Sequence, residues 1–447
     1  MEDDYFDIMK TNKNSINNVI NNVKLSNDQF ILDILQDAIY RTNKIVYHTY
    51  NFLKLYVLHL HNTEFFVPFV DEHLIRTIMN VVSIRNDNRG PKPNTETNEI
   101  IKKLTLFYKK YYIKTIDNDI VSNDKLSQIL NYEATDIIKN INTNIKEHYT
   151  QHVNKLINVT FDWKRKIAKI NNNTKIDLET KKKLKSELYY EFKKIKNDVF
   201  NIKNDELTSN VKYHKWIKLT KCHIIPHKDN YSKNSIHYDV CCNPQDYIES
   251  LIFINQELES FGTDDDPIKL FHVLPLRTRI IPNYITLDTW SIINLFFETD
   301  KLYYLSNIKI KQKEIWNKFF KTNDKSFKKG EEYRFNYMIK TDGVGCSILF
   351  IKLDSNKEPI KVTKNKLKKM EVLKKNDTKY IEDQPKIAEL IGNKNYVCID
   401  PNLSDLMYCQ DKNGTKFRYT QNQRRLETRN KKYNKVIQKI NTETRID

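Results

Sequence analysis

Hydrophobic positions in the first 260 residues recur mostly at helical spacing. Between Phe30 and Leu55 the apolar side chains return every three or four residues, the pattern of a helix with one buried face. Six of the seven glycines lie beyond residue 260, which also favours helices in the first part of the chain. We therefore expect a helical lobe over residues 1–262. The same spacing predicts further helices over residues 71–83, with Asp71 as N-cap, and over 98–112, 126–170, 178–200 and 246–259.

The pattern changes after residue 268 to short apolar runs that are typical of strands. Two helical segments, TWSIINLFFE and KQKEIWNKFF, stand between these runs. We therefore expect a second, β-rich domain over 268–360. The predicted strands are LFHVLPL (270–276), NYITLD (283–288), EYRFNYMIK (332–340) and VGCSILFIKL (344–353).

A Lys-rich stretch over 361–393 is expected to be a basic linker, and a third unit covers 394–447. In "NYVCIDPNLSDLMYC" (395–409) a short apolar strand stops at Asp400-Pro401, because proline cannot extend a ladder. Residues 406–409 and 416–420 predict a hairpin around an Asn-Gly turn. From Gln421 onward the sequence predicts one basic helix.

Charge adds a candidate partner to this picture. The chain of 447 residues has a net charge of +18, which favours a polyanion such as RNA or DNA, although a solvated lysine-rich surface is the alternative. Residues 361–447 hold 21 Lys and Arg against 11 Asp and Glu, a concentration suited to phosphates. A solvated helix remains the other interpretation. The candidate nucleic-acid-binding residues are Arg424, Arg425, Arg429, Lys431, Lys432, Tyr433 and Lys435.

Cysteine usage and the N-terminus indicate a soluble, intracellular protein with no membrane partner. The six cysteines form no disulfide framework, the N-terminus is acidic, and no apolar run is long enough to span a bilayer. Between Cys222 and Cys242 six Cys and His residues offer zinc ligands, but their spacing matches no common finger. Zinc binding and ordinary loop residues both remain open. Since GxxxxGK[ST] is absent, NTP-driven chemistry is not expected.

Three segments in a fixed order resemble the TnpB/Fanzor family, transposon-encoded relatives of RNA-guided nucleases, in its eukaryotic and giant-virus branch. "RTNKIVYHTYNFLKLYVL" (41–58) is also similar, so the resemblance covers most of the chain. The three segments are "FHVLPLRTRIIPNYITLDTWSIINLF" (271–296), "IWNKFFKTNDKSFKKGEEYRFNYMIKTDGVGCSILF" (315–350) and "VCIDPNLSDLMYCQD" followed by "RYTQNQRRLETRNKKYNKV".

The resemblance implies a multidomain α+β protein of a mobile element. Its parts would be a helical recognition lobe, a β-barrel-like wedge domain and a RuvC/RNase H-like nuclease segment that cuts DNA under a guide RNA. Asp400 matches the first catalytic aspartate, which binds Mg²⁺, and Asn402 stands where many members have glycine. The expected location is the nucleus, or a viral factory in the cytoplasm of a host cell.

The resemblance also implies catalytic groups that this chain does not contain. Members supply further acids from two later segments and a zinc ribbon between them, and two-metal hydrolysis needs several carboxylates. The chain ends at Asp447 and has no CxxC. We therefore expect a C-terminally truncated and catalytically incomplete protein, so enzymatic activity stays open. Asp405 and Asp411 are interpreted as surface residues.

Three outcomes follow from that expectation. A second polypeptide could complete the nuclease, the protein could be a non-enzymatic nucleic-acid-binding protein or a decaying remnant, or it could be a basic structural protein of an AT-rich virus. The apolar side chains of Val397, Ile399, Leu406 and Tyr408 should lack cover, and the last fifty residues should be loosely packed or covered by another chain. Asp342 is interpreted as a turn residue rather than an RNA contact.

Overall fold

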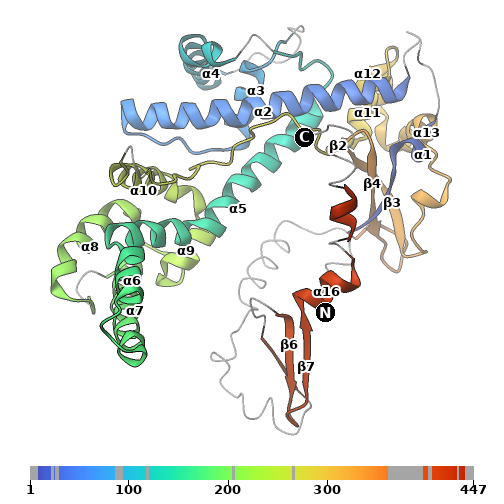
Figure 1. Ribbon diagram of the computed structural model, residues 1–447. Coiled ribbons are helices and arrows are strands. Elements are labelled where there is room, and N and C mark those ends of the chain that lie inside the picture. Colours follow the sequence, from blue (N-terminus) through green and yellow to red (C-terminus); the bar gives the residue numbers. More distant parts are fainter. Residues whose placement is uncertain are drawn as a thin grey trace. The chain divides into compact units, whose positions relative to one another are not determined.

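The chain forms two compact units, Met1–Ile360 and Lys361–Asp447 (Figure 1). The computed structural model describes residues 9–21, 25, 30–85, 94–116, 120–203, 207–263, 267–360, 396–400, 405–429 and 432–437. For Asp400 and Asp405 it describes the backbone alone.

Helices make up most of the first unit. Its α-helices are α1 Ile16–Val19, α2 Ile31–Glu64, α3 Glu72–Val81, α4 Thr95–Phe107, α5 Ser127–Thr160, α6 Trp163–Asn172, α7 Leu178–Phe200, α8 Val211–Ile224, α9 Ile236–Cys242, α10 Ile248–Ser260, α11 Thr289–Phe296, α12 Lys301–Ser306 and α13 Ile308–Phe319. Shorter turns are the π-helix η1 Tyr108–Tyr112 and the 3₁₀ turns η2 Ile113–Thr115, η3 Ser232–Asn234, η4 Pro244–Tyr247 and η5 Lys325–Phe327.

Local signals in the sequence place several of these helices correctly. The α3 helix begins where expected, because the Leu74 N–H donates to Asp71 Oδ1 (2.7 Å) and satisfies one unpaired amide of the first turn. The bounds of α7 are those predicted. The helix expected over 126–170 is instead divided into α5 and α6 by Asp162, whose φ of 52° breaks the helical path. Helices α8 and α9 were not predicted.

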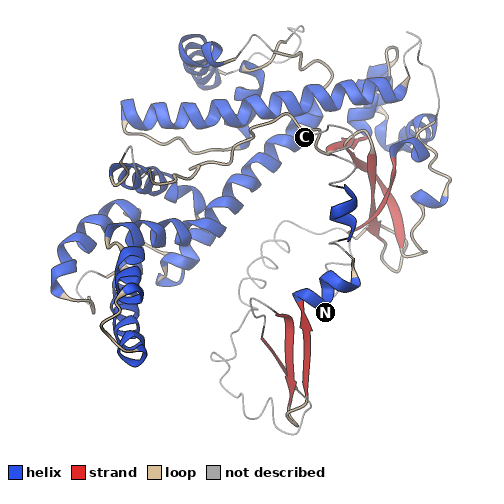
Figure 2. Cartoon of the chain, viewed as in Figure 1, coloured by secondary structure: helices blue, strands red, loops and turns tan. Residues whose placement is uncertain are grey.

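A four-stranded antiparallel sheet, β1-β4-β3-β2, packs with the helices (red in Figure 2). Among the described residues it stays open and does not close into a barrel, so the expected barrel-like wedge is an α+β unit with a small sheet. The strand expected over 270–276 is wrong: those residues run without a ladder partner, and Asn255 instead bonds both backbone groups of Phe271. The strands are β1 Met9–Ser15, β2 Ile285–Asp288, β3 Tyr333–Thr341 and β4 Gly345–Lys352.

The N-terminal strand β1 was not predicted, because MKTNKNS has almost no apolar residues. It is an edge strand held by its backbone, with Met9 opposite Ile351 and Ser15 opposite Gly345. Residues from the beginning of the chain and from 285–352 therefore share one sheet.

One hydrophobic core runs from this sheet into the helices. The long helices α2 and α5 extend from the sheet and α11, and α6 to α9 lie near the far end of α5 (Figure 1). Trp316 is fully buried, and its Nε1–H donates to Thr289 Oγ1 (2.9 Å). Asp288 caps α11 by accepting from Ser291 N–H (2.8 Å). The sheet and its neighbouring helices are thus packed as one body.

The second unit contains a three-stranded antiparallel sheet, β5-β6-β7, followed by helix. The predicted hairpin is confirmed, and Gly414 takes the left-handed conformation (φ 82°) that its turn requires. The prediction of a single basic helix is wrong. Helix α16 ends at Glu427, Arg429 has a φ of 53°, and a second short helix covers 432–437. The elements are β5 Val397–Asp400, β6 Asp405–Asp411, β7 Lys416–Thr420 and α16 Gln421–Glu427.

Candidate nucleic-acid interface

The basic helix α16 is joined directly to the hairpin. Thr420, the last residue of β7, caps the helix by accepting from Gln423 N–H (3.0 Å). Tyr419 donates its hydroxyl to Glu427 Oε2 (2.6 Å), and this bond to a carboxylate raises the pKa of Tyr419. Gln423 Nε2 donates to Glu427 Oε1 (3.1 Å). Neutral groups therefore hold the carboxylate of Glu427.

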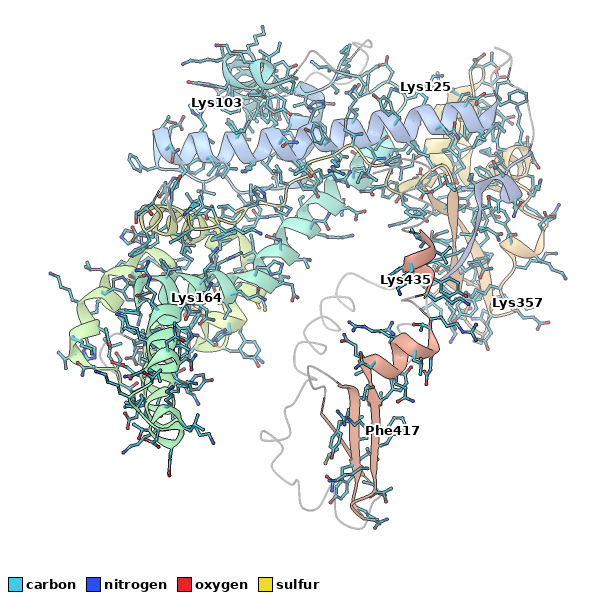
Figure 3. The ribbon with its side chains drawn as sticks, in the orientation of Figure 1. Lys103, Lys125, Lys164, Lys357, Phe417 and Lys435 are labelled. Atoms are coloured by element: carbon cyan, nitrogen blue, oxygen red, sulfur yellow. The ribbon has the colours of Figure 1, made fainter. Side chains whose placement is uncertain are left out.

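Five exposed cations follow along this segment. Within the described residues none of them forms an ion pair with a carboxylate, since the acid in α16 is held by Tyr419 and Gln423. Tyr433 is exposed among them, and Lys435 is labelled in Figure 3. Lys431, also predicted to bind, lies outside the described residues. We call the following set the basic C-terminal segment: Arg424, Arg425, Arg429, Lys432 and Lys435.

The break at Arg429 divides this segment into two short helical pieces. Thr428 Oγ1 donates to Arg424 O (2.7 Å), which completes the last turn of α16. The backbone carbonyl of Arg429 then accepts from Lys432 N–H (2.9 Å) and Tyr433 N–H (3.1 Å). The sequence predicts that the cations follow one continuous helix. The break at Arg429 means that they do not.

Asp400 is the last residue of β5, as the sequence predicts. In the ladder it lies opposite Tyr408 of β6, which in turn lies opposite Arg418 of β7. Of the candidate catalytic acid itself only the backbone is described. Asp400 therefore occupies the end of an edge strand, in one cross-strand row with a tyrosine and an arginine.

The neighbouring acids lie elsewhere on the hairpin. Asp411 is opposite Val397, at the other end of β5, and its Oδ1 accepts from Asn413 N–H (2.9 Å) and Thr415 N–H (2.7 Å). It lies in the turn that the sequence predicts around Asn413-Gly414, and it is half-buried where a surface residue was expected. Asp405 pairs with Thr420 in the ladder.

A magnesium site needs several oxygen ligands around one point. The part of the chain that the structure describes contains no group of three or more Cys, His, Asp or Glu side chains able to hold a metal ion. The Asp411 carboxylate is engaged by its own turn. The side chain of Asp400, the ligand that the resemblance implies, lies outside what the structure describes, so the Mg²⁺ site stays a prediction.

Five of the six Cys and His residues between 222 and 242 lie on helices, and His227 lies in the loop between them. Cys222 and His223 belong to α8, and His237, Cys241 and Cys242 to α9. The His223 ring stacks on Phe253 (4.4 Å between centroids), and the His237 ring lies against Phe200 (4.9 Å). Both histidine rings therefore pack against phenylalanine rings.

Asp342 belongs to the turn between β3 and β4. Its Oδ1 accepts from Val344 N–H (3.0 Å) and Gly345 N–H (2.7 Å). These bonds are those of a turn-forming aspartate, as expected.

The two sides of the C-terminal sheet differ in character. Phe417 and Tyr419 alternate along β7 with Lys416 and Arg418, so one side is apolar and the other is basic. On the apolar side Val397, Ile399 and Phe417 (labelled in Figure 3) are 57%, 61% and 58% exposed. Of the four side chains expected to lack cover, Val397, Ile399 and Leu406 (37%) are exposed, whereas Tyr408, which lies on the basic side in register with Arg418, is half-buried.

Other lysines are spread over the first unit. Lys103, Lys125, Lys164 and Lys357, labelled in Figure 3, are all exposed and come from four separate segments. No helix in the described ranges has both the length and the apolar character needed to cross a bilayer.

Comparison with known proteins adds one match of limited extent. No curated protein matches the chain. Residues 285–352, from β2 through α11, α12, α13 and β3 to β4, are similar to a domain of unknown function, DUF8286.

Proposed function

We propose that the protein binds RNA and DNA through the basic C-terminal segment, as a TnpB/Fanzor-like protein of a mobile element whose relatives are RNA-guided nucleases. The observation that carries the proposal is a set of five exposed cations without an acidic partner among the described residues, beside an exposed tyrosine.

Nucleic acid is the polyanion that such a set fits. Each phosphate neutralised by Lys or Arg releases condensed counterions, so binding is favourable and depends strongly on salt. Three of the five cations are arginines, whose planar guanidinium can bond a phosphate with two N–H groups. Tyr433 offers a face on which an unpaired base can stack.

The test replaces all five cations of the basic C-terminal segment by glutamine and measures RNA and DNA affinity against salt concentration. A matched control replaces five exposed lysines of α6 and α7, which removes the same charge elsewhere: Lys164, Lys169, Lys182, Lys183 and Lys193. We expect the segment variant to lose at least tenfold in affinity and the salt slope to fall by about 0.7 to 0.9 per lost phosphate contact. An equal effect of both variants contradicts the proposal, because net charge alone would then explain binding.

A second candidate is a nuclease whose RuvC-like part is shared with another polypeptide. It is supported by the uncovered apolar side of β5-β6-β7, which a sheet of this kind normally buries. The resemblance assigns the catalytic role to Asp400. In a reconstitution with guide RNA, Mg²⁺ and a matching DNA target, Asp400→Ala should abolish cleavage, whereas Asp405→Ala should not. Cleavage that survives Asp400→Ala excludes this candidate.

A further inference from the structure

A cavity of about 560 Å³, lined by both polar and apolar side chains, lies between α3 and α4 in the first unit. Helices packed side by side normally meet through apolar side chains. Here the facing surfaces carry arginine, histidine, threonine and asparagine beside Val81 and Ile101. The cavity therefore calls for an explanation other than core packing.

Helix α3 has two different sides. Leu74, Ile75, Ile78 and Met79 are buried in the core. The cavity side carries His73, Arg76, Thr77 and Asn80, at spacings of three, one and three residues.

Helix α4 faces this polar side. Its Thr97, Ile101 and Thr105 are spaced four residues apart and line the same cavity. The acidic residues of α4, Glu96 and Glu99, are not among the cavity's lining residues.

Arg76 is a half-buried cation without an acidic partner. Among the described residues its one polar contact is Nη1 to Met79 Sδ (3.8 Å), a weak acceptor, and no carboxylate lies within ion-pair distance. Burial lowers the pKa of Arg76 to about 10. A guanidinium withdrawn from water is unfavourable unless an anion compensates it, so the empty partner position points to a ligand.

Tyr108 supplies an independent observation. Its hydroxyl is buried and has no hydrogen-bond partner among the described residues. The residue begins η1, a π-helical turn, and π-helical turns are frequent at functional sites. The same turn places Lys109 on the cavity. A buried hydroxyl that donates to nothing is costly, and a ligand acceptor would satisfy it.

The charges around the cavity have one sign. Arg76, Arg85 and Lys109 line it, and no Asp or Glu is among the described lining residues. Thr77 Oγ1 already donates to His73 O (2.8 Å) and Thr97 Oγ1 is bonded to His73 Nε2 (3.2 Å), so the neutral donors that the lining offers a ligand are those of Asn80, Thr105 and Tyr108. Such a lining disfavours a cation and suits an oxyanion.

We infer that this cavity binds a phosphate group, held by the Arg76 guanidinium and the Tyr108 hydroxyl. The phosphate can come from a nucleic-acid backbone or from a free phosphorylated small molecule. The inference goes beyond the proposed function, because its residues belong to the first unit and are separate from the basic C-terminal segment.

The first experiment measures the melting temperature of the full chain with inorganic phosphate and pyrophosphate, against sodium chloride at equal ionic strength. Phosphate should stabilise the wild-type protein and bind at least tenfold more weakly to Arg76→Met. Tyr108→Phe, which removes one hydroxyl, should weaken binding less. Lys102→Gln, an exposed change on α4, is the matched control and should have no effect.

Arg76→Met also keeps the test informative if the cavity tolerates change poorly. Without phosphate this variant should be as stable as the wild type or more stable, because a buried uncompensated charge is removed. Equal stabilisation by phosphate and chloride, or phosphate binding that Arg76→Met leaves unchanged, overturns the inference.

A short single-stranded RNA distinguishes the two phosphate sources. If Arg76→Met also weakens RNA binding, the ligand is a backbone phosphate; if it affects pyrophosphate alone, the ligand is a free phosphorylated molecule. The glutamine variant of the basic C-terminal segment should retain phosphate stabilisation. Failure of the proposed function would therefore leave this inference standing, and the reverse also holds.

Discussion

Glu133 of α5 is a carboxyl group placed where its ionised form is unfavourable. Burial raises its pKa to about 7, and the charges of Arg277 and Lys340 offset only part of this effect. Arg277 is itself bonded to Asn43 Oδ1 (3.2 Å) and lies over the ring of Tyr50. Near neutral pH, Glu133 therefore carries a proton in a substantial fraction of folded molecules.

The raised pKa makes stability depend on pH in a definite direction. The folded protein binds the Glu133 proton more tightly than the unfolded chain, so this contribution is complete below about pH 4.5 and is lost as pH rises through about 7. We predict that Glu133→Gln is more stable than the wild type at pH 8, by about 2 kcal/mol, with no advantage at pH 4. Urea unfolding at both pH values measures this, and Glu147→Gln, an exposed position of α5, is the control.

Asp239 shows the opposite behaviour. It is fully buried and accepts from Ser232 N–H (3.0 Å), Asn243 Nδ2 (3.0 Å) and Tyr247 Oη (2.8 Å), and it pairs with Lys228. Burial alone raises the pKa of Asp239, but the Lys228 ammonium and these hydrogen bonds outweigh it and hold the pKa below its usual value. Its contribution is therefore present at neutral pH and lost as pH falls below about 4.

Asp239→Ala should lower the free energy of unfolding by about 3–5 kcal/mol, because it leaves three donors without their acceptor and Lys228 with the exposed Asp246 as its remaining ion-pair partner. The matched control is Asp246→Ala. Asp246 also pairs with Lys228 (2.9 Å) but is exposed, so its loss should cost about 1 kcal/mol or less. Denaturant unfolding at pH 7 compares them, and similar losses from both variants would contradict the structural assignment.

Single residues were predictable from the sequence where their partners are close in the chain. Asp71, Asp342 and Asp411 bond amides two to four residues away, so cap and turn rules identify them. Arg76 was missed because its environment is created by α4, more than twenty residues later. Its one sequence signal is a lone arginine within the apolar run HLIRTIMNVV.

At the scale of elements, the turn between β3 and β4 depends on Gly343. Its φ is +88°, and a Cβ there would lie 3.3 Å from Ile39 Cδ1 of α2. Gly330 also has positive φ (+65°), but a Cβ there would meet nothing within 4 Å. Both glycines therefore have a backbone conformation that disfavours other residues, but a side chain would meet a neighbouring atom at Gly343 and none within 4 Å at Gly330.

We predict that Gly343→Ala destabilises the first unit by about 2 kcal/mol or more, whereas Gly330→Ala costs about 1 kcal/mol. Thermal unfolding of both variants measures the difference. An equal loss of stability in both variants would mean that backbone strain alone determines the effect, and that Ile39 of α2 moves to accommodate the added methyl group.

Elements with a strong internal pattern were predictable, and those that depend on distant partners were not. Helix α7 starts at the Asp177 cap and keeps its predicted bounds, since every signal is local. Residues 270–276 have the composition of a strand, but they pair with no other strand among the described residues. Strand β1 pairs with β4, although its composition is not that of a typical strand. The predicted basic helix is interrupted at Arg429, a position that its sequence periodicity does not indicate.

At the scale of the whole molecule, the two units differ in how much they bury. The first has a continuous apolar core, whereas in the second Cys409 is the one buried apolar residue among those described. We predict that amides of β5, β6 and β7 exchange with solvent much faster than those of α2 and α5, because local opening exposes little additional apolar surface. Hydrogen exchange followed by mass spectrometry measures this, and equal protection would contradict it.

The sequence predicts separate domains over 1–262 and 268–360, whereas both ranges belong to the one unit Met1–Ile360. Charge and glycine content change along the chain, and both are visible in sequence. The mixing of an N-terminal strand with residues 285–352 in one sheet is set by non-local packing, which no window of sequence contains.

That mixing has a consequence for synthesis. Asn12, in β1, bonds the backbone of Ser326, 314 residues later. At about 5–20 residues per second, a ribosome needs on the order of 15–60 s to synthesise the residues between Asn12 and Ser326. Throughout that interval β1 lacks β4, its partner in the sheet, and its hydrophilic side chains remain compatible with water until β4 has been made.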